Sequence, residues 1–491
     1  MLFNSIDFMI FFPIVVFIYF IIPRKIRYIW LLLTSYYFYM GWNPKYTILI
    51  AFSTVITYAS SILIERSQNA GNAKRKKFWV AGSIILNLGI LFVFKYSDFF
   101  LHNLSAVISR LGFGTIDKRL DLLLPVGISF YTFQVLSYTL DVYRGEIKAE
   151  KNLFKYALLV SSFPQLVAGP IERATNLLPQ IQNVDKINVW NYEKIKDGLL
   201  LMMWGLFQKL VIADRASILV NNVITGYVNY GFVELALAAA LFAIQIYCDF
   251  GGYSNIARGA AKVMGFELMN NFEQPYLATS IKEFWRRWHI SLTSWLTDYV
   301  YIPLGGNRKG RIRKYINILI VFGVSGLWHG ASWSFVVWGL LHAFYQIIGD
   351  LKNAVFSKSI GKGNRSRNTF SSRLRKVIGT FILTDFAWIF FVCSDMQQAL
   401  GVIKNMLTYV QTTDIFELGL DRGNWFFLIM GIAILFFVDL MHEKGISVSA
   451  LVQKQDIVFR WGIYLALIWT TIMFGIYGMA YDTSAFIYFQ F

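Results

Sequence analysis

Residues 274–342 read QPYLATSIKEFWRRWHISLTSWLTDYVYIPLGGNRKGRIRKYINILIVFGVSGLWHGASWSFVVWGLLH. This segment holds three of the five histidines of the chain, and His289 and His329 each follow a tryptophan directly. An uncompensated ionisable group in a lipid-embedded protein costs about 3 kcal/mol or more in free energy. A histidine at such a position is therefore expected to have a structural or functional role. Histidine is the side chain best suited to move a proton near neutral pH. We therefore take this segment as the working site, against the simpler interpretation that its histidines only pack between helices.

Composition points to a membrane protein. The chain has 491 residues, of which 56% are hydrophobic and 15% charged, whereas soluble proteins carry about 25% charged residues. The net charge of +17 comes from Lys and Arg in short blocks between long apolar runs. That distribution is typical of cytoplasmic loops and argues against nucleic-acid binding. The chain is thus predicted to be an all-α polytopic integral membrane protein. Cys248 and Cys393 lie in apolar runs without metal-ligand spacing, so neither a disulfide nor a metal site is predicted.

The apolar runs predict the membrane spans. Residues 6–22 have no basic region before them and no small-residue cleavage site after them, so we expect a retained first span with its N-terminus outside. Residues 99–108 are too short to cross a bilayer. Pro and Gly interrupt residues 122–140 and 153–167, which predicts re-entrant or interfacial pieces. Further spans are predicted at residues 28–42, 46–64, 79–96, 198–213, 233–246, 377–392, 425–440 and 461–480.

Residues 281–299 have the pattern of one amphipathic helix of the kind that lies in a membrane interface. At about 100° per residue, the aromatic and aliphatic side chains gather on one side of this helix, and Glu283 and Arg287 on the other. His289 falls about 40° from Trp285, at the edge of the apolar stripe. We therefore expect its side chain to point into the protein or toward lipid.

Residues 315–348 are too long for one ordinary span and are interrupted at Ser325-Gly326 and after His329. Basic residues flank this stretch at both ends, which predicts a hairpin or a pair of broken helices. Broken helices within the membrane are tolerated only where they are buried in protein or line a cavity. The acid in the run 247–255, Asp249, is interpreted as the structural partner of an arginine or a helix end rather than as a catalyst.

Five blocks of sequence, in this order along the chain, resemble the membrane-bound O-acyltransferase family and, within it, the bacterial alginate O-acetyltransferase branch. They are FPQLVAGPI at 163–171, YCDFGGYS at 247–254, EFWRRWHISL at 283–292, DYVYIPLGGN at 298–307 and GLWHGA at 326–331. The resemblance implies about eleven transmembrane helices, with re-entrant and amphipathic helices around a central funnel or tunnel. It also implies one membrane-embedded acyltransferase domain over residues 1–491, with N-terminal spans at 1–150, a catalytic core at 151–350, a basic cytoplasmic loop at 351–376 and C-terminal spans at 377–491.

The resemblance further implies that His329 is the essential catalytic residue and His289 the second family histidine. The donor would be a cytoplasmic thioester, acetyl-CoA or an acylated carrier protein, with no metal. The acceptor would be an exopolysaccharide such as alginate or a cell-wall polymer, reached through extracytoplasmic acetyltransferase partners of the bacterial plasma membrane. Basic residues at 308–314 are suited to attract the donor's phosphates, although such loops also orient membrane proteins in general.

The residues themselves agree with that chemistry, because a neutral imidazole accepts a proton from a hydroxyl that attacks a thioester. We take His329 as the base and His289 as its helper, with Asp249, Asn307 and Trp328 in support. One alternative within the family is a D-alanyl transferase for teichoic acid, which uses an aminoacyl carrier protein. The alternative from another class is a polysaccharide or lipid-carrier transporter. The sequence assigns no role to His102, His342 and His442.

Overall fold

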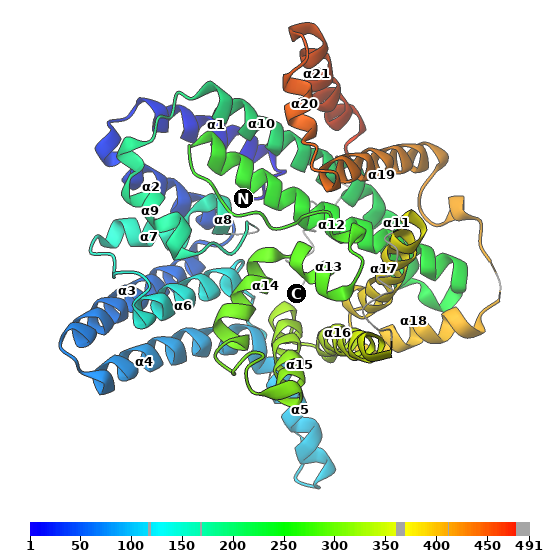
Figure 1. The fold of residues 1–491 in the computed structure, drawn as a ribbon, viewed down its shortest axis with the longest axis horizontal. Helices are drawn as coiled ribbons and strands as arrows, with labels where there is room; N and C mark the ends of the chain where they lie inside the picture. The colour runs from blue at the N-terminus through cyan, green and yellow to red at the C-terminus, as the bar shows by residue number, and fades with distance from the viewer. Residues whose placement is uncertain (116–118, 167–168, 360–368, 411, 478–491) are drawn as a thin grey trace. The chain divides into compact units, whose positions relative to one another are not determined.

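Every regular element in the described part of the chain is a helix (Figure 1). The computed structural model describes residues 1–115, 119–166, 169–359, 369–410 and 412–477. Within these ranges, six helices are long and apolar enough to cross a membrane. They are Pro44–Asn69, Ala73–Arg110, Phe232–Val263, Trp333–Ala354, Arg422–Glu443 and Ile457–Phe474. The predicted all-helical fold is therefore confirmed.

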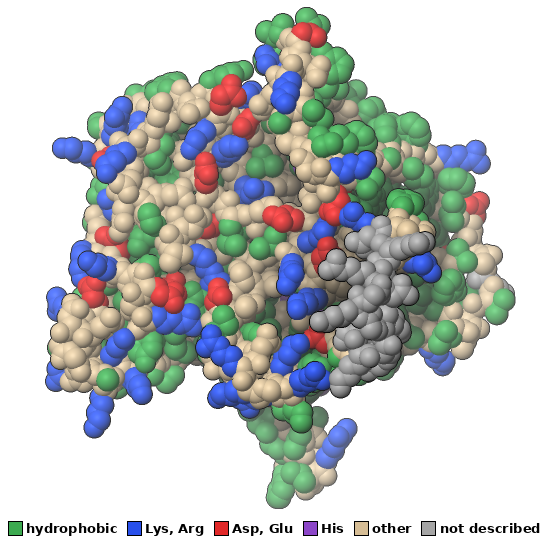
Figure 2. All heavy atoms as spheres, in the orientation of Figure 1, with side chains coloured by type: hydrophobic (Ala, Val, Ile, Leu, Met, Phe, Trp, Pro, Cys, Tyr) green, Lys and Arg blue, Asp and Glu red, His purple; other side chains and the backbone are tan. Residues whose placement is uncertain are grey.

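Large hydrophobic side chains cover much of the outer surface, as expected of helices that face lipid. On α1 (Ile6–Ile21), for example, Ile6 is 75% exposed and Phe17 is 63% exposed. Figure 2 shows extensive hydrophobic areas on the face that it draws, beside many Lys and Arg side chains. Such surfaces would be aggregation-prone in water and are stable against acyl chains.

The chain divides into two compact units, residues 1–202 with 255–269 and residues 203–254 with 270–491. The long helices α10 (Tyr192–Leu206) and α12 (Phe232–Val263) contribute residues to both. The other helices of the first unit are α1, α2 (Arg27–Met40), α3 (Thr47–Asn69), α4 (Ala73–Leu91), α5 (Ser97–Arg110), α6 (Ile128–Arg144), α7 (Leu153–Ser161), α8 (Phe163–Leu166) and α9 (Ala174–Gln182).

The first unit corrects one predicted span boundary. Helices α4 and α5 are joined through a π-helical turn at Phe92–Tyr96 into one helical run, Ala73–Arg110. The prediction of a separate short piece at 99–108 is therefore wrong. The polar residues between the two apolar runs, Lys95, Ser97 and Asp98, lower the hydropathy there, but no Gly or Pro lies between Leu91 and Arg110 to stop the helix.

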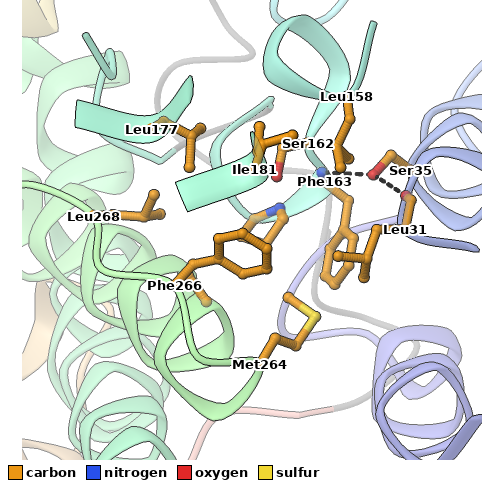
Figure 3. A pocket seen from close by; sticks show the side chains of 12 residues that line it. Leu31, Ser35, Leu158, Ser162, Phe163, Leu177, Ile181, Met264, Phe266 and Leu268 are labelled. Atoms are coloured by element: carbon orange, nitrogen blue, oxygen red, sulfur yellow. Dashed lines mark hydrogen bonds between the residues drawn. The ribbon is translucent and has the colours of Figure 1, made fainter. Parts of the chain in front are cut away.

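The helical structure is interrupted within residues 122–140 and within the described part of 153–167, and a re-entrant or interfacial position of these pieces stays a prediction. Gly127 has a left-handed φ of 74° and precedes α6, and Ser162 separates α7 from α8 with a ψ of 115°. The backbone N–H of Phe163 donates to Ser35 Oγ at 3.1 Å (Figure 3). The pocket beside Phe163 has a volume of about 10 Å³, which is room for about one water molecule. This part of the FPQL block therefore packs closely against neighbouring helices.

The second unit carries the segment with the paired Trp-His motifs. Its helices are α11 (Asp214–Thr225), α13 (Ile281–Arg287), α14 (Ile290–Leu296), α15 (Gly310–His329), α16 (Trp333–Ser359), α17 (Phe370–Val392), α18 (Met396–Thr408), α19 (Arg422–Glu443), α20 (Val448–Gln453) and α21 (Ile457–Phe474). Two π-helical turns, η5 (Phe207–Ala213) and η8 (Thr297–Tyr301), interrupt the regular geometry. The basic loop is shorter than the predicted 351–376, because α16 continues to Ser359 and α17 begins at Phe370.

The predicted single helix at 281–299 is wrong, because the chain breaks at His289. This residue has a left-handed φ of 43°, which is rare outside glycine, and it separates α13 from α14. The break is supported by Asn271, whose backbone carbonyl accepts from the N–H of Ile290 at 3.0 Å. Its side-chain Oδ1 accepts from the N–H of Ser291 at 3.2 Å. A residue distant in sequence thus caps α14, which the helical periodicity of 281–299 does not reveal.

The hairpin predicted at 315–348 is confirmed as α15 and α16, which pack closely through glycines. A Cβ on Gly326 would lie 2.3 Å from the carbonyl oxygen of Phe335, and one on Gly339 would lie 2.2 Å from that of Phe322. Small residues allow the backbones of membrane helices to approach in this way, which increases van der Waals contact. The close approach holds His329, at the end of α15, against α16.

We expect Gly339→Ala to destabilise the protein by about 1–3 kcal/mol, since its methyl group must push α15 and α16 apart. The matched control on the same helix is Gly349→Ala, where no atom lies within 4 Å of an added Cβ. That change should be neutral or stabilising by up to about 1 kcal/mol, because alanine favours the helix. Thermal unfolding of both variants in detergent tests the contrast, and equal midpoints would contradict it.

A buried ionic cluster links η5, α11 and α12 in the second unit. Lys209 Nζ lies 2.8 Å from Asp214 Oδ1 and 2.7 Å from Asp249 Oδ1, and all three side chains are at most 5% exposed. Lys209 also lies over the ring of Tyr253, 5.5 Å from its centre. The structural interpretation of Asp249 is thus confirmed, with a lysine as its partner where an arginine was expected.

Candidate active site

The structure brings together the two histidines that the sequence singled out. The ring centres of His289 and His329 are 6.3 Å apart. His289 is fully buried at the break between α13 and α14, and His329, at the end of α15, is only 3% exposed. The expectation that His289 points into the protein is therefore confirmed.

Aromatic rings enclose the histidine pair. Trp328 lies 5.7 Å from His289 and 5.0 Å from His329, measured between ring centres. Phe250 packs on His289 at 4.7 Å, and Trp338 and Phe391 pack on His329 at 4.9 and 5.3 Å. Such surroundings exclude water and disfavour the charged form of an imidazole. Burial accordingly lowers the pKa of His289 to about 3, which keeps this ring neutral at physiological pH.

Hydrogen bonds orient the His289 ring. Its Nδ1 lies 3.2 Å from Asn271 Oδ1, an oxygen that also accepts from the hydroxyl of Ser291 at 2.9 Å. Because an amide oxygen can only accept, Nδ1 of the neutral ring carries the hydrogen and Nε2 carries the lone pair. Asn271 therefore fixes both the backbone break and the tautomer of His289. The sequence analysis missed this residue.

A cavity of about 330 Å³ opens beside α13, α14 and α15. We call it the α13–α15 cavity. Its lining residues are Lys282, Trp285, Arg286, Leu292, Thr293, Leu296, Thr297, Tyr301, Asn307, Lys314, Ile318, Val321, Phe322, Ser325 and Gln346. The volume is at the lower end of the range typical of small-molecule sites. About half of these residues are aliphatic or aromatic, and three of the others, Lys282, Arg286 and Lys314, are cationic.

Two of these cationic side chains can bind an anionic ligand. Lys282 and Arg286 are exposed, and neither forms an ion pair within the described ranges. Lys314 is instead paired with Asp350. The cationic residues of the cavity thus differ from the predicted 308–314 block, of which only Lys314 takes part. Lys282 and Arg286 belong to α13, and the sequence analysis assigned them no role.

Trp285 separates the cavity from the histidine pair. Its ring lines the cavity and lies 5.7 Å from that of Trp338, which in turn packs on His329. Ser325 also lines the cavity, one helical turn before His329 on α15. Two aromatic rings in series, Trp285 and Trp338, thus connect the cavity lining to His329.

An ion network holds α13 in place through Arg287 at its C-terminal end. Arg287 Nη1 lies 2.5 Å from Glu443 Oε2, and Arg287 also pairs with Glu283, while Arg373 pairs with Glu443. Burial by itself would raise the pKa of Glu283, but hydrogen bonds from Thr279 and the charge of Arg287 lower it overall. The charged side of the predicted amphipathic helix is therefore occupied by structural ion pairs.

The chain is similar in sequence to several known proteins. Residues 146–393 match the sequence profile of MBOAT, the membrane-bound O-acyltransferase family. Over 90% of this chain and 81% of the relative, the chain is 34% identical to "Probable alginate O-acetylase AlgI" of Pseudomonas aeruginosa. The chain belongs to the membrane-bound O-acyltransferase family. It is therefore an acyltransferase and a multi-pass membrane protein with bacterial relatives.

The names of other similar proteins mention different acceptor polymers. The chain is 35% identical to "Peptidoglycan O-acetyltransferase" of Helicobacter pylori over 77% of this chain and 73% of that one. Similarity to "Teichoic acid D-alanyltransferase" of Bacillus subtilis is lower, 26% over 44% of this chain and 57% of the relative. Membership of an acyltransferase family removes the basis for the transporter alternative.

The other residues predicted from the sequence lie in different parts of the second unit. Trp328 lies in the histidine pair's aromatic shell, and Asn307 lines the cavity, where its Oδ1 accepts from Tyr301 Oη. Asp249 belongs to the Lys209 cluster instead. Cys248 and Cys393 are free and buried. Among the described residues, no group of three or more His, Cys, Asp and Glu side chains is arranged to hold a metal ion.

Proposed function

We propose that this acyltransferase takes an acetyl group from a cytoplasmic thioester and delivers it for O-acetylation of a polysaccharide outside the bacterial plasma membrane. The observation that carries the proposal is the pair of buried imidazoles, His289 and His329, 6.3 Å apart within an aromatic shell. The proteins named as alginate and peptidoglycan O-acetyltransferases support the acetyl group and the polysaccharide, since each matches more than three quarters of this chain.

His329 is the general base of this proposed reaction. Its neutral imidazole takes the proton of the attacking hydroxyl while the hydroxyl oxygen bonds to the thioester carbonyl carbon. The carbon–sulfur bond then breaks, and the imidazolium returns the proton to the departing thiolate. The products are an ester and a thiol, with His329 neutral again. The surrounding rings keep water from competing with the acceptor.

His289 assists without changing its charge. With Nδ1–H held by Asn271, Nε2 is the ring nitrogen that carries the lone pair and can accept a hydrogen bond from the acceptor hydroxyl. Such a contact positions the hydroxyl for attack, which lowers the entropic cost of reaching the transition state. Loss of His289 should therefore reduce the rate less than loss of His329.

The α13–α15 cavity is the proposed site of the donor, acetyl-CoA or an acylated carrier protein. Both donors carry phosphate, which matches the unpaired charges of Lys282 and Arg286, and a long flexible arm, which matches the aliphatic and aromatic part of the wall. The remaining family features belong to the same proposal. They are about eleven spans, re-entrant helices around a tunnel, and extracytoplasmic acetyltransferase partners that receive the acetyl group.

For the acceptor we propose only its chemical class, a polysaccharide. Identities of 34% and 35% to the alginate and peptidoglycan enzymes do not separate these polymers. A D-alanyl transfer to teichoic acid is less well supported, because the matching part covers under half of this chain.

The test measures ester-bound acetyl and D-alanyl groups on exopolysaccharide and on peptidoglycan in cells that lack the protein and in complemented cells. We expect acetyl ester on one polymer to disappear without the protein and to return with it. Restoration of D-alanyl ester alone would favour the teichoic acid alternative. Ester levels that are the same with and without the protein would overturn the proposal.

A further inference from the structure

A third histidine, His342 on α16, lies beside the site although the proposed mechanism does not use it. Its side chain is fully buried. Among the described residues, neither of its ring nitrogens has a hydrogen-bond partner. Its neighbours are aromatic rings from four helices. They are Phe284, Trp285, Phe322, Trp338, Tyr345 and Trp388, at 5.1 to 6.4 Å between ring centres.

A polar ring in this position is unfavourable for stability. Each buried polar atom without a partner costs about 1–3 kcal/mol, whereas a phenyl ring would fill nearly the same volume at no such cost. Local violations of this kind are found mainly at functional sites. The aromatic environment of His342 is therefore better explained by a role in the reaction than by packing.

The ring contacts connect His342 to the catalytic pair through a single side chain. The ring of Trp338 makes an edge-to-face contact with His342, with centres 5.2 Å apart and planes at 76°. It makes a second edge-to-face contact with His329 at 4.9 Å and 85°. In such a pair the polarised N–H of an imidazole is attracted to an indole face more strongly than a phenyl C–H is. His342 can thus hold the Trp338 indole against which the His329 ring packs.

We propose that His342 is a positioning residue of the acyl-transfer site, which sets the orientation of His329 through the Trp338 indole. The inference rests on the proposed function, since it assigns His329 as the base. It differs from a donor-binding role, because His342 does not line the α13–α15 cavity and contacts it only through Trp285 and Phe322, which do. Displacement of a catalytic group by about 1 Å costs about a hundredfold in rate.

The first test compares His342→Phe with the wild type in acetyl transfer by purified protein. We expect kcat to fall about 10- to 100-fold, with the KM for the donor unchanged within about twofold, since uniform binding is not affected. His342→Gln, which keeps a side-chain N–H, should recover part of the loss. The matched control is His102→Phe, an exposed histidine on α5 that should retain wild-type kcat. A raised KM with unchanged kcat, or a kcat above half the wild-type value, would overturn the proposal.

The second test asks whether the effect passes through Trp338. If it does, the double variant His342→Phe/Trp338→Phe should lose no more activity than Trp338→Phe alone, because residues in one path are not additive. If the losses of activity of the two single variants add up in the double variant, the effect of His342 does not pass through Trp338. If His342→Phe does not fold, the same comparison of single and double variants is made with His342→Gln.

A spectroscopic measurement separates this inference from the proposed function. In protein labelled with ¹⁵N-histidine, the imidazole signals of His329 should shift in His342→Phe, while those of His102 should not. Unchanged His329 signals would refute the positioning role even if the wild type transfers acetyl groups. A wild type that transfers none would refute the proposed function, and the shift would still decide whether the rings are coupled.

Discussion

Purified His329→Ala protein is expected to transfer acetyl groups at least about 10²- to 10⁴-fold more slowly than the wild type, the usual contribution of a general base. The reason is that the alanine has no group to take the hydroxyl proton, and the apolar rings around it admit no water to replace the imidazole. Transfer from radiolabelled acetyl thioester to an acceptor measures the rate. The donor KM should change little, because His329 acts in the transition state and not in donor binding.

Two controls separate this result from misfolding. His329→Gln keeps most of the side-chain volume and should be nearly as inactive, since an amide is not a base at neutral pH. His102→Ala changes an exposed histidine of α5 and should keep wild-type activity. Membrane levels and elution profiles of all variants should match. If His329→Ala retained more than a tenth of the wild-type rate, another residue would have to be the base.

Lys209→Met is expected to destabilise the protein by about 3–5 kcal/mol, the usual cost of removing one partner of a buried ion pair. The change leaves the carboxylates of Asp214 and Asp249 buried beside each other without the cation that lies 2.8 and 2.7 Å from them. Met retains the length and apolar character of the lysine stem, so lost packing contributes little. Thermal unfolding in detergent should show a lower midpoint.

The matched control for this prediction is Lys262→Met on α12. Lys262 pairs with Asp197 at 3.2 Å, but both side chains are about one-third exposed. An ion pair in that setting contributes about 0–1 kcal/mol. Asp249→Asn is expected to fall between the two, since Lys209 keeps Asp214 as a partner. If Lys209→Met were no less stable than Lys262→Met, the cluster would not support the fold.

The same cluster connects stability to the active site. Asp249 is followed by Phe250, whose ring packs on His289 at 4.7 Å. Movement of α12 after loss of Lys209 would therefore disturb the shell of the histidine pair.

The break at His289 was not predictable from residues 281–299, because the helical periodicity of that segment is satisfied by a continuous helix. Its cause is Asn271, ten residues before the segment begins, whose carbonyl and side chain cap α14. Lys209 could have been noticed in the sequence, since it interrupts the apolar run 198–213. Its two partners are assigned only by the packing of η5 against α11 and α12.

The sequence by itself determined the membrane class, the helical fold, the family and the two histidines. These follow from local properties: hydropathy, the spacing of Gly and Pro, and the Trp-His motifs. The tertiary structure decided which side chains meet, namely the 6.3 Å approach of His289 and His329, the α13–α15 cavity and the position of His342 behind Trp338. Such contacts depend on close packing between helices that lie far apart along the chain, and one-dimensional patterns do not encode them.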